Sequence, residues 1–444
     1  MKYHFTKTLL ILNYSLLIIL SSCSVNKQIS KQATGILLKD SSIATGHIGI
    51  CIYEPATGKY WYEYNSTHYF IPASNTKLFT LYAGMKYLGD SLVGLRYTIA
   101  SDTLYALPTG DPSFLNPEYS YQPAIDLLNK YHLPTLFSSA NWKAEKFGRG
   151  WAWNDYNDDY MAERSALPLH ANLASIQYKR GFDQPFSLEP YYLNYDRERY
   201  FEKNRKEVFI KRNVSENIFN VFYGPINFDT FRIQIPFVTN GISSALSILH
   251  SEYRWIFERD TTFNIQNLKF KIIKSIPSDS LFKPMMHRSD NFFAEQTLLM
   301  ASNEHLGYMN DEKIIDTLLK TDLKDVPQKP KWVDGSGLSR YNLFTPKDFV
   351  YILNKMQNEF GLPRMKVILP TGGEGTLSAY FKKDAGFIYA KTGTLSNNCA
   401  LSGYLITSKG KLLIFSILAN NYITGASPIR RAEERFLEYI REKY

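Results

Sequence analysis

Cysteine is scarce in this chain of 444 residues, which contains only Cys23, Cys51 and Cys399. No CxxC pair and no HExxH spacing occurs, so the sequence gives no support for a zinc site, and we expect neither a metal ion nor another cofactor. Cys51 and Cys399 lie in apolar, strand-like surroundings. We expect them either to pair in an oxidising compartment or to remain as two buried free thiols.

Arginine-rich runs and known nucleic-acid-binding motifs are also missing, so we do not expect nucleic acid as a partner. None of the eight His residues stands in a recognisable pattern with Ser and Asp, which disfavours a Ser-His-Asp triad. The chain is 44% hydrophobic and 15% aromatic, which is typical of a folded protein over most of its length. Its net charge of +9 suits an anionic polymer or a membrane face.

Hydrophobic runs long enough to cross a membrane are absent as well. The apolar stretch at residues 9–20 is short and interrupted by Asn13-Tyr14-Ser15. It follows a basic start and leads into Leu20-Ser21-Ser22-Cys23, which resembles a bacterial lipobox. We therefore expect residues 1–22 to be a signal peptide and Cys23 to be the lipidated first residue of the mature protein. An ordinary secretory signal with a chance cysteine is the alternative.

The remaining chain is expected to contain a catalytic domain with an insertion. Residues 23–40 are polar and are interpreted as a lipidated tether, and residues 41–96 and 281–444 are expected to form the catalytic domain. Strand patterns near both ends surround helical patterns, which predicts an α/β (α+β) fold with one antiparallel sheet flanked by helices. Residues 97–280 are rich in Tyr, Asn, Asp and Phe and predict a large, mostly β insertion that divides into one or two subdomains.

Ser74-Asn75-Thr76-Lys77 is an SxxK sequence at the start of a predicted helix. This spacing puts Ser74 and Lys77 on one helical face, and the amino end of a helix favours negative charge on the serine. A neutral Lys77 can take the serine proton, provided that burial or a nearby cation lowers its pKa from about 10.4. The motif alone carries no weight, because it also occurs at Ser24, Ser280 and Ser408; only Ser74 opens a long amphipathic helix.

Two further sequences follow in order. Ser289-Asp290-Asn291 opens a predicted helix and can also be explained as a simple N-cap. Lys391-Thr392-Gly393 lies in an apolar strand, where Gly393 allows close backbone approach, but Lys391 can also be a solvated edge lysine. Each sequence is expected by chance in about one chain in ten of this length, and the ordered set in about one in a hundred. The set is typical of penicillin-interacting serine enzymes.

Around these sequences, the chain resembles the D-alanyl-D-alanine carboxypeptidase/endopeptidase family, the class C low-molecular-mass penicillin-binding proteins. The similar segments are residues 71–78, 287–295, 334–342 and 390–395. The spacing of 215 residues between Ser74 and Ser289 also fits that family's long insertion, whereas β-lactamases place the two sequences much closer. The resemblance implies the penicillin-binding protein/β-lactamase-like transpeptidase fold.

The same resemblance implies roles for the site residues. Ser74 would attack the penultimate D-Ala carbonyl, with Lys77 as general base whose neutrality is aided by Lys391. Ser289 would relay a proton to the leaving nitrogen, and Asn291 would hold the substrate amide and Lys77.

In the third sequence, Lys391, Thr392 and Thr394 would receive the terminal carboxylate beside Gly393. The backbone N–H groups of Ser74 and Thr394 would form the oxyanion hole. Residues 334–342 are expected to shape the fold. Trp151, Trp153 and Tyr160 are expected to pack in the core or at the surface, and contact with the peptide stem is the alternative.

We therefore expect a serine D-alanyl-D-alanine carboxypeptidase, a D,D-endopeptidase, or both, acting on peptidoglycan stem peptides through an acyl-enzyme. β-Lactam antibiotics would be its covalent inhibitors. The expected location is the periplasm, with a lipid anchor in the outer membrane of a Gram-negative bacterium. Two alternatives remain open: a non-catalytic peptidoglycan-binding lipoprotein, and a β-lactamase or esterase on the same fold.

Overall fold

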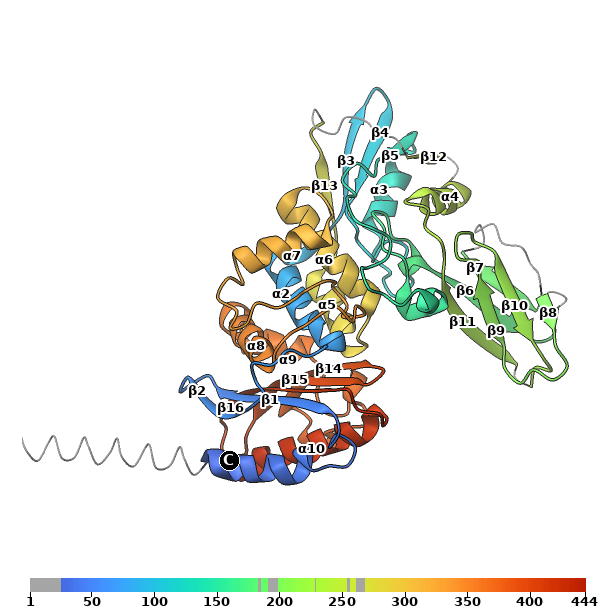
Figure 1. The fold of residues 1–444 in the computed structure, drawn as a ribbon. Coiled ribbons are helices and arrows are strands. Elements are labelled where there is room, and N and C mark those ends of the chain that lie inside the picture. The colour runs from blue at the N-terminus through green and yellow to red at the C-terminus, as the bar shows by residue number, and fades with distance from the viewer. Residues whose placement is uncertain (1–24, 183–184, 191–198, 228, 254–255, 261–267) are drawn as a thin grey trace, which may run out of the picture.

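The computed structural model describes residues 25–182, 185–190, 199–227, 229–253, 256–260 and 268–444 (Figure 1). The expected signal peptide and Cys23 lie outside these residues. Within them, no helix combines the length and the apolar character needed to cross a bilayer.

One antiparallel sheet is built from both ends of the chain, as predicted. Its strand order is β14-β15-β16-β1-β2, so β1 pairs with β16 and β14 lies at an edge. The strand patterns near residues 47–64 and 387–419 therefore belong to one sheet. The bounds are β1 (His47–Glu54), β2 (Lys59–Tyr64), β14 (Ile388–Leu395), β15 (Asn398–Ile406) and β16 (Leu412–Asn420).

Helices cover both faces of this sheet (Figure 1). On one face lies α10 (Ala426–Lys443), whose apolar stripe is buried, as its helical spacing predicts. The other face carries the helices that position the site. Their bounds are α2 (Lys77–Tyr87), α5 (Ser278–His287), α6 (Asn291–Leu306), α7 (Asp311–Lys320), α8 (Pro346–Phe360) and α9 (Leu362–Ile368).

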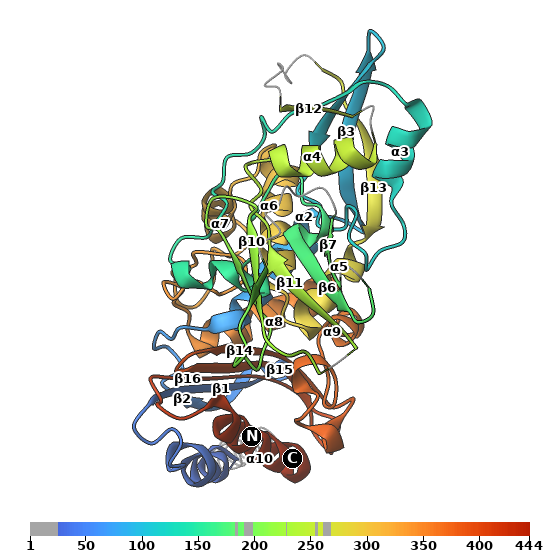
Figure 2. The same cartoon turned by 90° about the vertical axis from the view of Figure 1, so that its right-hand side faces the viewer.

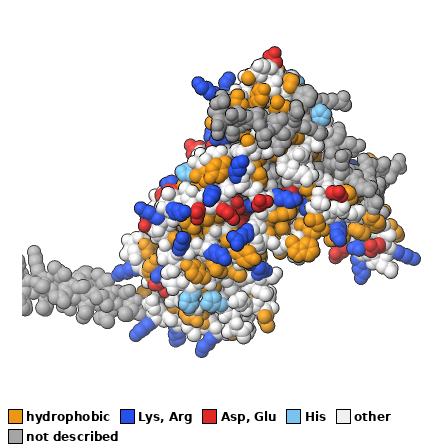
Figure 3. All heavy atoms as spheres, turned by 45° about the horizontal axis from the view of Figure 1, so that its top comes forward, with side chains coloured by type: hydrophobic (Ala, Val, Ile, Leu, Met, Phe, Trp, Pro, Cys, Tyr) orange, Lys and Arg blue, Asp and Glu red, His pale blue; other side chains and the backbone are white. Residues whose placement is uncertain are grey.

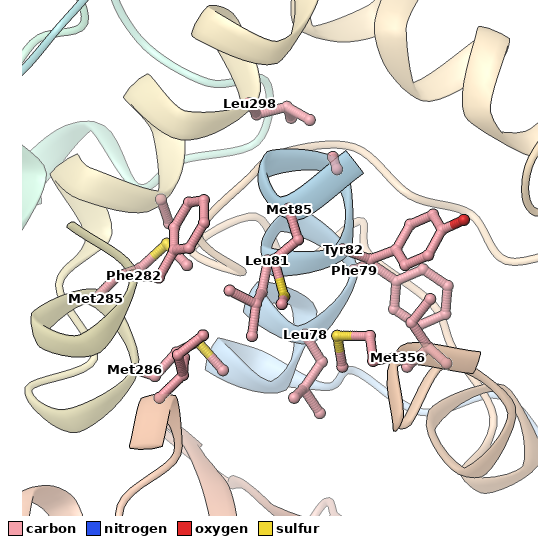
Figure 4. Close-up of a cluster of buried hydrophobic side chains, with 14 of the residues drawn as sticks. Leu78, Phe79, Leu81, Tyr82, Met85, Phe282, Met285, Met286, Leu298 and Met356 are labelled. Carbon is pink, nitrogen blue, oxygen red and sulfur yellow. The ribbon is translucent and has the colours of Figure 1, made fainter. Parts of the chain in front are cut away.

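The central helix α2 is buried along almost its whole length. A short 3-10 turn, η2 (Ala73–Thr76), leads into it. Figure 4 shows Phe282, Met285 and Met286 of α5 on one side of α2, and Met356 of α8 on the other side, toward which Phe79 and Tyr82 of α2 itself point. Because α2 is enclosed from several directions, the turn that carries Ser74 at its start has a fixed place in the molecule.

The segment expected to be a polar tether is ordered instead. Residues 25–33 are α-helical and continue into a π turn, η1 (Thr34–Leu38), which packs against α10. Ile29, Ala33 and Leu37 recur every four residues and are completely buried. The expectation was wrong for this segment because three apolar residues, spaced as one helical stripe, outweigh its polar composition.

The described residues of the insertion form two β units (Figure 2). The first is a five-stranded sheet, β12-β5-β4-β3-β13, with α3 (Pro123–Tyr131) and α4 (Ser243–Glu252); the second combines the sheets β11-β6-β7 and β8-β10-β9. The insertion begins with β3 at Ser91 and ends with β13 at Pro277, so the predicted limits at 97 and 280 cut through β3 and α5. The bounds are β3 (Ser91–Ala100), β4 (Thr103–Pro108), β5 (Thr135–Phe137), β6 (Leu173–Lys179), β7 (Phe186–Glu189), β8 (Arg199–Phe201), β9 (Phe209–Arg212), β10 (Phe219–Tyr223), β11 (Thr230–Pro236), β12 (Ile256–Asp260) and β13 (Lys271–Pro277).

Charged side chains on the face drawn in Figure 3 are mixed in sign. Lys and Arg are spread over this face with Asp and Glu between them. The positive net charge is therefore not gathered into one patch on this face.

Candidate active site

The structure brings Ser74, Lys77 and Asn291 together at the start of α2 and α6. The Nζ of Lys77 lies 3.0 Å from Ser74 Oγ, 2.6 Å from Asn291 Oδ1 and 2.8 Å from the carbonyl oxygen of Ser336. A neutral amine has two N–H donors and one lone pair. Because the Asn291 and Ser336 oxygens can only accept, they take both donors, and the lone pair is left for the Ser74 hydroxyl.

Burial supports this neutral state of Lys77. The side chain is completely buried, which lowers its pKa from 10.5 to about 8, against the opposing charges of Asp290, Asp334 and Glu295. About a tenth of the amine is therefore neutral at pH 7, and this neutral form can accept the proton of Ser74.

A second buried lysine lies beside the first. The Nζ of Lys391 is 2.9 Å from Ser289 Oγ and 2.7 Å from the carbonyl oxygen of Thr392. Burial, followed by the charges of Lys77 and Arg430, lowers the pKa of Lys391 well below its ordinary value. Lys391 has no solvent-exposed surface, so the solvated-edge explanation is wrong.

In Ser289-Asp290-Asn291, the N-cap explanation holds for the middle residue alone. Asp290 is the N-cap of α6, and its side chain accepts a hydrogen bond from the backbone N–H of Phe293 at 2.9 Å. Ser289 precedes it in a left-handed conformation, with φ of 62°. The cap thus leaves Ser289 and Asn291, on either side of it, free to contact Lys391 and Lys77.

The turn that carries Ser74 is held between two glycines. A Cβ at Gly393 of β14 would lie 2.5 Å from the carbonyl oxygen of Pro72 and 3.1 Å from the backbone nitrogen of Ser74. On the other side, a Cβ at Gly337 would lie 2.0 Å from the carbonyl oxygen of Ala73. No side chain fits at either position, so β14 and the 334–342 loop approach the Ser74 turn closely.

Asp334 organises that loop, as expected for residues that shape the fold. Its carboxylate accepts from the backbone N–H of Gly337 at 2.9 Å, the N–H of Ser339 at 2.7 Å and the side-chain amide of Asn342 at 2.7 Å. These bonds fix the loop in the form that presents the Ser336 carbonyl to Lys77.

A cavity of about 550 Å³ opens at Ser74. Trp151 and Tyr160 of the insertion line it, whereas Trp153 is not among its lining residues and is 77% exposed. The place of Trp151 and Tyr160 beside the site fits the alternative of contact with the peptide stem, whereas Trp153 lies at the surface, as packing predicted. The other lining residues are Gly150, Ala152, Asn154, Asp155, Met161, Asn291, Gly337, Leu338, Arg340, Thr394, Leu395 and Ser396.

Sequence reasoning missed the buried charges behind the site. Glu295 accepts from the backbone N–H of Ser336 at 2.6 Å and pairs with Arg164 of the insertion at 3.1 Å. Burial and the neighbouring Asp334 raise the pKa of Glu295 to about 7, against the effect of Arg164. The spacing from Asn291 to Glu295, one helical turn, was the signal that could have found it.

Arg430 on α10 is the other residue that sequence analysis missed, because no short motif or helical spacing marks it.

The two remaining cysteines, Cys51 and Cys399, are buried free thiols rather than a disulfide. Burial raises the pKa of the Cys399 thiol to about 12. Among the described residues, no group of three or more His, Cys, Asp or Glu side chains is placed to hold a metal ion.

The site pairs a serine hydroxyl with a buried lysine, on a turn that leads into a helix and lies against the edge strand of this sheet. This arrangement places the protein in the class of penicillin-interacting serine enzymes. The model of the D-Ala-D-Ala carboxypeptidase 3 (S13) family matches residues 30–192 and 261–440. The chain belongs to this family and is a serine-type D-Ala-D-Ala peptidase.

Relatives match most of the chain. Penicillin-sensitive carboxypeptidase A of Dictyostelium discoideum is 25% identical over 448 residues, covering 83% of this chain and 82% of the relative. D-alanyl-D-alanine carboxypeptidase DacB of Haemophilus influenzae is 23% identical, covering 86% and 87%. The crystal structure of penicillin binding protein 4 from H. influenzae superposes with a TM-score of 0.73 and 19% identity over 93% of this chain and 99% of that one. The penicillin-binding protein fold is therefore confirmed.

Proposed function

We propose that this enzyme cleaves peptidoglycan stem peptides after D-Ala, both as a carboxypeptidase and as a D,D-endopeptidase, through an acyl-enzyme on Ser74. The observation that carries the proposal is the contact of Lys77 Nζ with Ser74 Oγ, with the two N–H donors of the neutral amine taken by Asn291 and Ser336. This geometry activates a serine without histidine.

During acylation, one proton moves from Ser74 to the leaving nitrogen by way of Lys77. Ser74 Oγ attacks the carbonyl carbon of the penultimate D-Ala while its proton passes to Lys77. The backbone N–H groups of Ser74 and Thr394 stabilise the oxyanion. When the peptide bond breaks, a proton from Lys77 reaches the leaving nitrogen through the Ser289 hydroxyl. In deacylation the oxygen of a water bonds to the acyl carbon, the ester bond to Ser74 Oγ breaks, and the water's proton returns through Lys77 to Ser74 Oγ.

Substrate position follows from the neighbouring polar groups. Asn291 holds the substrate amide, and Lys391 with the hydroxyls of Thr392 and Thr394 receives the terminal carboxylate beside Gly393. Support comes from the 2.8 Å hydrogen bond between the Thr392 and Thr376 hydroxyls, which orients Thr392 at the edge strand. In endopeptidase action the same site accepts the cross-linked D-Ala.

β-Lactams fit this site as covalent inhibitors because their strained amide presents the same carbonyl to Ser74. The Dictyostelium relative is named penicillin-sensitive, and the H. influenzae protein has been solved with a bound β-lactam, at a TM-score of 0.69 to this chain. Both observations support the proposal.

Product analysis on purified muropeptides tests the function. Wild-type enzyme should release free D-Ala from pentapeptides and convert cross-linked dimers to monomers, and Ser74→Ala should do neither. Binding of muropeptides without any product would support a non-catalytic binder instead. Rapid, complete hydrolysis of penicillin would support a β-lactamase.

We further propose that the enzyme is held in the periplasm by a lipid on Cys23, with the outer membrane as its site of attachment. The Leu20–Cys23 sequence supports this proposal. Cys23→Ala should move the protein from the membrane fraction to the soluble periplasmic fraction. An unchanged distribution, with no lipid on the mature N-terminus by mass spectrometry, would refute it.

A further inference from the structure

Helix α10 places one buried guanidinium against the strand that borders the active site. Nη2 of Arg430 donates to the carbonyl oxygen of Gly393 at 2.7 Å, and Nη1 donates to the carbonyl oxygen of Ala400 at 2.7 Å. Arg430 is 4% exposed and pairs with the buried Glu433 at 3.0 Å. In Figure 1, α10 lies on the face of the sheet opposite α2, so Arg430 reaches β14 from behind the site.

The direction of the backbone groups on β14 relates this contact to the site. Lys391 Nζ contacts both the Thr392 carbonyl oxygen and Ser289 Oγ, which places that carbonyl on the free, active-site edge of β14. Successive carbonyls of a strand point to opposite sides, so the Gly393 carbonyl points toward β15, where Gly393 is paired with Ala400. The next N–H, that of Thr394, points to the free edge beside Ser74.

Arg430 and the Thr394 N–H therefore lie at opposite ends of one peptide unit. A charged donor on a carbonyl oxygen draws electron density from the amide and makes its N–H a stronger hydrogen-bond donor. We propose that Arg430 is a positioning residue for the oxyanion hole, which aims and polarises the Gly393–Thr394 peptide so that its N–H stabilises the oxyanion. This inference rests on the proposed acyl-enzyme mechanism and names a residue that tunes it.

A role in stability alone does not explain why Arg430 is buried beside Glu433 and contacts two strand carbonyls. A buried Arg–Glu pair is commonly neutral for stability when compared with apolar residues of similar size. Here one carboxylate oxygen of Glu433, Oε1, has no hydrogen-bond partner, while the guanidinium is directed at two carbonyls of the strands beside the site.

Three variants separate the roles of Arg430. Arg430→Met removes both carbonyl contacts, the 3.4 Å contact with Thr394 Oγ1 and the charge, whereas Arg430→Lys keeps the charge but cannot bridge both carbonyls. Glu433→Gln is the matched control, since it disturbs the same buried pair and leaves the guanidinium in place. For each folded variant, we would measure the rate constant of acylation by a penicillin and the infrared stretching frequency of the isotopically labelled acyl carbonyl.

We expect Arg430→Met to acylate roughly tenfold or more slowly, because one oxyanion donor is worth about 10²–10³ in rate and here it is weakened rather than removed. Its acyl carbonyl should absorb at higher frequency, because it is less polarised, with Arg430→Lys in between and Glu433→Gln like wild type. A wild-type carbonyl frequency in Arg430→Met would overturn the proposal, as would equal losses in Arg430→Met and Glu433→Gln. If Arg430→Met fails to fold, Arg430→Lys decides by the same two readouts. Failure of the proposed function is distinguishable, because wild type itself would then form no acyl adduct.

Discussion

At the scale of the residue, the chemistry depends on where one lysine amine is buried. Lys77 lies among acceptors that use both of its N–H groups, and its complete burial disfavours the charged form. The nearby acidic groups oppose this effect, which leaves its pKa at about 8 rather than far lower. The residue is therefore balanced close to the pH at which a general base is most effective.

The acylation rate should rise with pH through the pKa of Lys77. Because the folded pKa of about 8 lies below the ordinary lysine value of 10.5, the amine loses its proton as pH rises past 8, and only the neutral form accepts the Ser74 proton. We expect the rate constant for acylation to increase about tenfold per pH unit up to about pH 7 and to level off above about pH 9. Stopped-flow measurement with a chromogenic β-lactam checks this profile.

A variant of Asn291 tests whether Lys77 is the group whose titration controls acylation. Asn291→Asp places a carboxylate beside Lys77 Nζ, at the position of an oxygen now 2.6 Å away. This charge favours the protonated amine, so the rising limb should move to higher pH. A profile without pH dependence in wild type, or an unmoved limb in Asn291→Asp, would contradict Lys77 as the base.

At the scale of the element, the Ser74 turn depends on glycines that let two other segments approach it. Sequence analysis predicted a helix from Ser74, but residues 73–76 form a 3-10 turn and α2 begins at Lys77. Ala73 adopts a left-handed conformation with φ of 48°, directly against Gly337. The local pattern could not predict this turn, because it is imposed by the 334–342 loop and by β14.

Gly337→Ala should damage both stability and acylation. Gly337 has φ of 85°, and its new Cβ would meet the Ala73 carbonyl oxygen at 2.0 Å. Gly410→Ala is the control, since Gly410 has φ of 75° but no heavy atom within 4 Å of a Cβ. In both variants the left-handed conformation should lower the free energy of unfolding by about 1–2 kcal/mol, and only Gly337→Ala should displace the Ser74 turn.

Urea unfolding and penicillin acylation separate the two variants. We expect Gly410→Ala to acylate at the wild-type rate and Gly337→Ala to acylate roughly 100-fold more slowly. Equal acylation rates in the two variants would show that the Gly337 contact does not position Ser74.

At the scale of the whole molecule, the insertion is joined to the catalytic domain by buried charges. Arg164 bonds Glu295 at 3.1 Å and Asp311 at 2.7 Å, and Trp151 donates to Asp334 at 2.9 Å. Glu295 and Asp334 both organise the backbone around Ser336, whose carbonyl contacts Lys77. Docking of the insertion and alignment of the base are therefore parts of one network.

Arg164→Met should lower the free energy of unfolding by about 3–5 kcal/mol, because it leaves buried carboxylates unpaired. Lys320→Met is the control: Lys320 pairs with Asp316 at 3.0 Å, but both side chains are more than half exposed, and its loss should cost about 1 kcal/mol or less. Chemical denaturation measures both values. Equal costs for the two variants would show that the buried network does not hold the domains together.

Sequence alone could predict the parts whose signals are local. Ser74, Lys77, Ser289, Asn291 and Lys391 stand in short sequences, and the strand patterns at both ends define the catalytic sheet. The fold of the insertion was harder to predict, because β3 pairs with β13 and β6 pairs with β11 across long stretches of chain. The same reason hides Arg164 and Arg430, whose roles exist only after distant elements have packed.

Covalent labelling of Ser74 tests the central claim most directly. Wild-type protein incubated with a fluorescent penicillin should carry one adduct, which peptide mass spectrometry maps to Ser74. Ser74→Ala should show none, and Lys77→Met should label far more slowly while remaining folded. The absence of any adduct in wild type, or equal labelling of Ser74→Ala, would contradict the account.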